Sequence, residues 1–174
     1  EERKLKPGKK KWILRYEGDL FETIYRRCHI TTSSTLVEKS ALVDIGLFNE
    51  EYKIVEDSEM LLRFTMKFLV GYVEEPLTRY SWRYDNTSVR WQDELPDFEY
   101  KVHREYYDEL KNRSPDADFI FRTSMGNFHR SKAQIALKHH DYRKFLDHSI
   151  MALENEPFRL KNYSKLIKGM LSLF

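Results

Sequence analysis

Hydrophobic residues recur along the chain in two patterns, which change near residue 90. In the first part, short apolar runs alternate with helical stripes. This predicts strands at 12–16, 29–37, 72–73 and 78–84, and helices at 19–27, at 38–46 and from Glu56 to about Gly71. Beyond that point apolar positions repeat only at helical spacing, which predicts helices at 97–112, 119–138, 142–155 and 158–174. We expect a mixed α/β part followed by an all-helical part.

Composition narrows the class of protein. The 174 residues are 41% hydrophobic and 14% aromatic, enough to build the core of one domain or two small ones. The net charge is only +2 and is spread evenly, so we expect no nucleic-acid partner. No apolar run approaches the roughly 18–20 residues of a membrane-spanning helix. The single cysteine, Cys28, excludes an internal disulfide framework, and the six histidines fit no metal-ligand spacing.

The start of the chain indicates that it is a piece of a longer protein. It begins Glu1-Glu2-Arg3-Lys4, with neither an initiator methionine nor a leader-like segment.

The sharpest chemical feature is Glu56-Asp57 at the predicted start of a helix. One interpretation is structural, because an aspartate there accepts hydrogen bonds from free backbone N–H groups and suits the positive end of the helix dipole. The other is catalytic, because an ionised carboxylate can accept a proton. The two interpretations are compatible.

This pair belongs to one of four motifs that occur in a fixed order. They are a Thr/Ser run at 31–35, the loop Gly46-Leu47-Phe48-Asn49-Glu50, the helix start Glu56-Asp57-Ser58-Glu59, and the strand-like Gly71-Tyr72-Val73-Glu74-Glu75-Pro76-Leu77. In this order and spacing, residues 18–90 resemble the second half of the catalytic domain of family 2 glycosyltransferases, which have the GT-A fold. The fold class expected is therefore α/β for 1–90, the C-terminal part of a GT-A fold, followed by a helical extension over 91–174.

The resemblance implies an inverting transfer of a sugar from a nucleotide-activated donor to a hydroxyl of a glycan or lipid-linked acceptor, as in polysaccharide biosynthesis. Asp57 takes the place of the family's general base, and Glu56 that of a residue shaping the acceptor pocket. The candidate substrate-binding residues are Ser34, Trp82 and Arg83. Two departures weaken the match, because Asn49 replaces an aspartate and the histidine expected near Arg83 is missing.

The resemblance also implies a divalent metal, Mg²⁺ or Mn²⁺, on the donor diphosphate. Its ligands are expected outside this chain, since the only Asp-x-Asp, Asp116-Ala117-Asp118, sits where helix caps belong. We therefore expect the segment by itself to be inactive, the parent enzyme to be cytoplasmic, and the incomplete α/β half to favour self-association.

The helical part leaves alternatives open. Asp141-Tyr142 through Ala152-Leu153 to Pro157 resembles one tetratricopeptide-like unit, so residues 91–174 are alternatively a non-catalytic protein-interaction module. The predicted helix 158–174 is amphipathic and basic. Such a helix either packs against the preceding hairpin, which we favour, or makes peripheral contact with a membrane.

Overall fold

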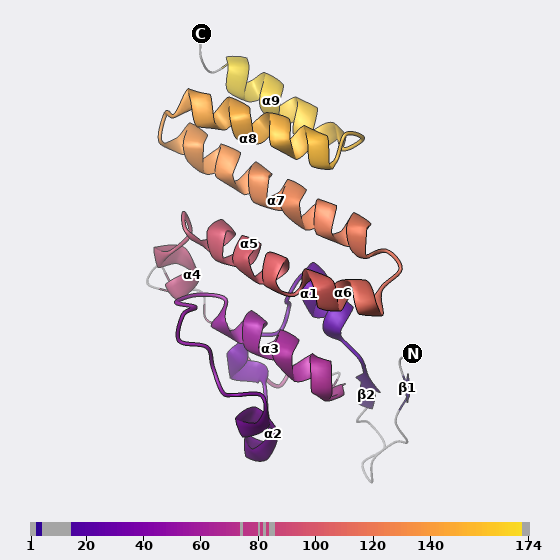
Figure 1. The fold of residues 1–174 in the computed structure, drawn as a ribbon. Helices are drawn as coiled ribbons and strands as arrows, with labels where there is room; N and C mark the ends of the chain where they lie inside the picture. Colours follow the sequence, from indigo (N-terminus) through magenta and orange to yellow (C-terminus); the bar gives the residue numbers. More distant parts are fainter. Residues whose placement is uncertain are drawn as a thin grey trace. The chain divides into compact units, whose positions relative to one another are not determined.

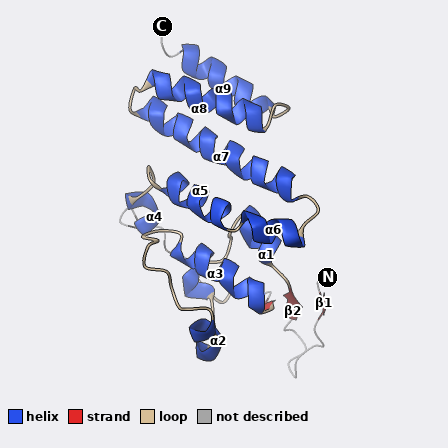
Figure 2. Cartoon of the chain, in the orientation of Figure 1, coloured by secondary structure: helices blue, strands red, loops and turns tan. Residues whose placement is uncertain are grey.

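The computed structural model describes residues 3–4, 15–73, 75–79, 81, 83 and 86–171. Helices make up most of this described chain (Figure 2). The chain divides into two compact units, Glu1–Thr87 and Ser88–Phe174.

The first unit combines short helices with a small antiparallel sheet. Its elements are β1 (Arg3–Lys4), β2 (Arg15–Gly18), α1 (Phe21–Arg26), the 3-10 turn η1 (Thr32–Ser34), α2 (Lys39–Asp44), α3 (Glu56–Lys67) and β3 (Val70–Val73). The central strand β2 pairs antiparallel with both β1 and β3, in a register that puts Gly18 opposite Val70.

The core of this unit forms where α1 packs on α3. Apolar residues on the facing sides of the two helices are almost fully buried, and include Phe21, Ile24, Tyr25, Leu61 and Leu62. This burial is the main favourable term that holds α3 in place.

The expected α/β fold is wrong. A parallel α/β core needs several long strands, whereas the described strands have two to four residues and pair antiparallel. Residues 29–37, predicted as a strand, instead contain η1. The hydroxyl groups of Ser34 and Thr35 donate to the carbonyl of Thr31, at 2.8 and 3.0 Å, and such local bonds compete with a strand ladder.

The two other predicted strands of this part also differ from the structure. The described residues of the segment 78–84 are loop, and Tyr80, Trp82 and Tyr84 lie outside the described residues. Strand β2 overlaps only the end of the segment 12–16, whose first three residues are likewise not described.

The second unit is helical throughout its described residues. Its elements are α4 (Thr87–Arg90, which begins at the boundary), α5 (Leu95–Glu105), α6 (Tyr107–Arg113), α7 (Ala117–Lys138), α8 (Tyr142–Asn155) and α9 (Leu160–Leu171). Figure 1 shows α7 between α5 and α8, with α9 packed on α8.

Local hydrogen bonds fix the turn that connects α7 to α8. His140 takes a left-handed conformation at φ 58°, and the next N–H group, that of Asp141, donates to the Ala136 carbonyl at 2.9 Å. The Asp141 side chain then caps α8 by accepting from the backbone of Lys144 at 3.1 Å. Small residues let the helices pack closely around Phe145, which is 3% exposed among Ala133, Ala136 and Leu166.

A buried polar cluster ties the α8–α9 turn to α7. Arg130 of α7, 8% exposed, forms an ion pair with Glu156 and donates to the Asn162 side chain at 3.1 Å. Asn162, 4% exposed, donates in turn to the carbonyls of Ala152 and Glu156, at 3.0 and 3.1 Å. The turn is therefore held by polar groups that satisfy one another.

Candidate functional site

Asp57 lies in the first turn of α3, next to Glu56, and both side chains are half-buried. Carboxylates are stabilised at this end of a helix because free N–H groups and the helix dipole both favour negative charge. The pair therefore lies in the first turn of the helix, but the N-cap residue is Val55, and no described side chain makes a capping hydrogen bond there.

The Asp57 carboxylate is oriented at both of its oxygens. Thr32, 25 residues earlier in the chain, donates from its hydroxyl to Oδ2 of Asp57 at 2.9 Å. The backbone N–H of Ser58 donates to Oδ1 at 2.7 Å, and the Ser58 hydroxyl lies 3.3 Å from the same oxygen. Each carboxylate oxygen keeps further acceptor capacity, since a carboxylate can accept about four hydrogen bonds.

The hydroxyl turn, defined here as residues 31–35, stands beside this carboxylate. Thr31 and Ser34 join their hydroxyl groups at 2.9 Å, and Ser34 also bonds to the Thr31 carbonyl. The side chains of Thr31, Thr32, Ser33 and Ser34 are exposed. An ionised acceptor therefore lies beside several hydroxyl groups at the surface.

The backbone before Asp57 is unusual. Val55, the N-cap residue of α3, has a left-handed conformation at φ 58°. This region is disfavoured for a β-branched residue, at a cost of about 1–2 kcal/mol. Strained residues of this kind cluster at functional sites.

Arg63, two turns further along α3, connects this helix to the loop after α2. Arg63 forms an ion pair with Glu59 at 2.6 Å, and the pair is largely buried, because Glu59 is only 1% exposed. The Arg63 guanidinium also donates to the carbonyls of Ile45 and Leu47, which flank the left-handed Gly46. Arg63 is therefore a structural clamp between α3 and the loop after α2.

The remaining predicted site residues are placed as follows. Ser34 lies in the hydroxyl turn that contacts Asp57 through Thr32. Arg83 is an exposed loop residue whose carbonyl accepts from the backbone of Asn86 at 3.2 Å. Trp82 lies outside the described residues. Thr32 is the residue that sequence reasoning missed, although it belongs to the same Thr/Ser run as Ser34.

The described residues do not fit a divalent metal, because nowhere among them do three His, Cys, Asp or Glu side chains come together to hold one. Asp116 occupies the N-cap position of α7, as predicted, and Asp118 accepts from the Tyr107 hydroxyl.

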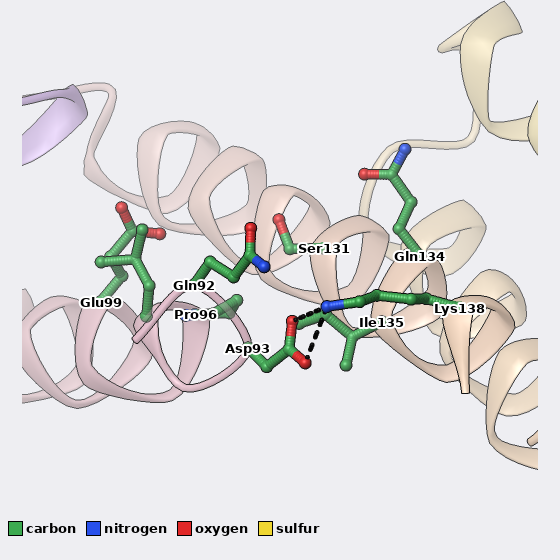
Figure 3. A pocket seen from close by; sticks show the side chains of 9 residues that line it. Gln92, Asp93, Pro96, Glu99, Ser131, Gln134, Ile135 and Lys138 are labelled. Carbon is green, nitrogen blue, oxygen red and sulfur yellow. Dashed lines mark hydrogen bonds and ion pairs between the residues drawn. The ribbon is translucent and has the colours of Figure 1, made fainter. Parts of the chain in front are cut away.

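A polar pocket of about 340 Å³ lies in the helical unit between the start of α5 and the end of α7 (Figure 3). At one edge, Asp93 accepts from Lys138 at 3.1 Å and from His139 at 2.8 Å. The hydrogen bond from His139, and then that from Lys138, lowers the pKa of Asp93. These exposed contacts of Asp93 connect the segment before α5 to the end of α7. No sequence motif indicates this connection.

Two histidines meet between α7 and α8. The Nδ1 atoms of His129 and His148 lie 3.0 Å apart, which fits one ring donating to the other while both are neutral. Burial, followed by the charge of His148, lowers the pKa of His129 to about 4.

Comparison with known proteins gives no relative: no family model, no curated protein and no solved structure matches this chain. Together with the mostly helical fold, this overturns the resemblance to family 2 glycosyltransferases. In addition, no helix of the described chain has the length and apolar character needed to cross a membrane.

Proposed function

We propose that the chain carries the acceptor side of a group-transfer site, in which Asp57 is the general base that activates an acceptor hydroxyl. The observation that carries this proposal is the Asp57 carboxylate, half-exposed and oriented by Thr32 at 2.9 Å. The left-handed backbone of Val55, two residues before Asp57, supports the assignment.

The proposed transfer is that of a sugar from a nucleotide-activated donor. Asp57 accepts the proton of the acceptor hydroxyl as its oxygen forms a bond to the anomeric carbon. The bond from that carbon to the diphosphate breaks, and the diphosphate leaves with the electron pair. Attack opposite the leaving group inverts the configuration. A positioned base of this kind contributes about 10²–10⁴ in rate.

Exposed hydroxyl groups beside the carboxylate suit an acceptor rich in hydroxyls, such as a glycan or the sugar of a lipid-linked acceptor. The hydroxyls of Thr31 and Ser34 can each donate and accept hydrogen bonds. The donor, and any metal on its diphosphate, would be held by residues other than the described ones. A cytoplasmic location is part of this proposal.

The test is Asp57→Asn in the complete protein that carries this chain, assayed for nucleotide release and acceptor glycosylation across a panel of nucleotide sugars. We expect kcat to fall by about 10²–10⁴ with little change in the KM of the donor.

Asp44→Asn is the matched control. Asp44 is also an aspartate of the first unit, but it is exposed, and it pairs with Lys67 at 3.1 Å. Its variant should keep full activity. If Asp57→Asn, folded as judged by its melting temperature, keeps normal transfer, Asp57 is not the base.

A further inference from the structure

The outer face of α9 is a continuous apolar surface. Five of its residues are 46–82% exposed: Leu160, Tyr163, Ile167, Met170 and Leu171. At 100° per residue these positions fall within an arc of about 100° on the helix. Phe158, just before α9, is 95% exposed and extends the surface. Together these six residues are the apolar face of α9.

This face points outward because the other side of α9 is fixed. Asn162 is buried and bonds to the carbonyls of Ala152 and Glu156. Gly169 lies against the ring of Phe145, and Leu166 packs on the cluster around that ring. The packing against the hairpin that the sequence favoured is therefore present, and the residues that the structure describes leave the apolar face of α9 exposed.

The charged side chains of the segment 157–174 are all basic. Residues 157–174 carry Arg159, Lys161, Lys165 and Lys168 and no acidic residue. By helical spacing the three lysine positions lie together along one side of the apolar arc. An apolar stripe bordered by cations is complementary to an anionic lipid surface, where acyl chains take the apolar side chains and headgroups take the cations.

A second copy of the chain is a poorer occupant. A twofold contact places the same patch on both partners, so it would bring two sets of these cations together. Repulsion between like charges disfavours that arrangement, whereas an anionic membrane removes it.

We propose that the apolar face of α9 is a peripheral docking surface for anionic membranes, with the helix lying in the plane of the interface. This site is separate from Asp57 and does not depend on the proposed function.

The test is co-sedimentation of the full chain with vesicles of phosphatidylcholine alone or of equal parts phosphatidylcholine and phosphatidylserine. We expect binding to the anionic vesicles to be stronger and to weaken as salt is raised. The double variant Ile167→Ser/Leu171→Ser should lose about tenfold or more of the affinity because two apolar anchors are removed. Lys161→Gln should lose about fivefold.

The control is Leu77→Ser, the same loss of an exposed apolar side chain (73% exposed) in the first unit. It should bind as the wild type does. The proposal is overturned if the chain does not bind anionic vesicles. It is also overturned if the double variant, with an unchanged melting temperature, binds them as well as the wild type does. It is also overturned if sedimentation velocity shows a dimer that the double variant dissociates, without vesicle binding, because a second copy then covers the face.

Discussion

Gly169 of α9 lies so close to Phe145 of α8 that a β-carbon on the glycine would stand 2.0 Å from Cζ of the ring. Phe145 is 3% exposed and cannot swing aside without opening the cluster around it. The contact decides how near α9 approaches the hairpin.

Gly169→Ala should therefore destabilise the helical unit and loosen α9. Overpacking costs about 1–3 kcal/mol, more than the roughly 1 kcal/mol that alanine gains over glycine in helix propensity. Thermal unfolding and limited proteolysis of α9 measure the effect. Ser164→Ala, at an exposed position of the same helix, should be neutral or slightly stabilising. A rise in melting temperature for Gly169→Ala would show that α9 does not pack on Phe145.

Arg63→Met should cost about 3–5 kcal/mol of unfolding free energy. It leaves the buried Glu59 carboxylate without its guanidinium partner and removes the donors to the Ile45 and Leu47 carbonyls. Denaturant unfolding is the measurement. Arg26→Met is a close control, since it breaks an i,i+4 glutamate–arginine pair that is about 40% exposed on both sides. That pair should contribute below about 1 kcal/mol, and equal losses in both variants would contradict a clamping role for Arg63.

Thr32→Val should lower kcat of the proposed transfer by about threefold to tenfold, the value of one hydrogen bond, while KM changes less. Valine keeps the shape of threonine but cannot donate to Asp57. Thr32→Ser keeps the hydroxyl and should restore most of the rate. Steady-state kinetics on the complete protein distinguish this positioning role from a general loss of structure, which would lower the melting temperature of both variants alike.

The stability of the helical unit should fall as the pH drops from about 6.5 towards 4. The folded-state pKa of His129 is about 4, below its value of 6.5 in the unfolded chain, so the unfolded state binds more protons in this window. Burial also lowers the pKa of His148, which acts in the same direction. Melting temperatures between pH 7.5 and 4 measure the slope, and His129→Gln should flatten it. A slope unchanged by that substitution would contradict the assignment.

The helices were largely predictable from sequence. The structure confirms α8 at its predicted bounds, since Asp141 and Pro157 mark its ends by chemistry that acts within a few residues. Helix α7 also agrees to within two residues. The predicted helix at 97–112 is instead two helices that meet at Tyr106, a break that no proline or glycine signals.

The strands were predicted less well. A high content of β-branched residues does not distinguish a strand from a turn whose hydroxyl groups form hydrogen bonds within the turn, as in residues 31–35. The position of Asp57 in the first turn of a helix could be predicted from the helical spacing of the apolar residues that follow it. Its contact with Thr32 spans 25 residues and depends on how α1 and α3 pack, which periodicity does not encode. The pairing of Asp93 with Lys138 is equally non-local.

The buried amide of Asn162 sets the minimum length of the helical unit. A chain that stopped before this residue would keep most of the apolar cluster, yet it would leave the Ala152 and Glu156 carbonyls without the donor that now serves both. Arg130 would lose an acceptor at the same time. The hydrogen bonds of Asn162 therefore limit how far this unit can be shortened, and a boundary for expressing it on its own has to fall beyond this residue.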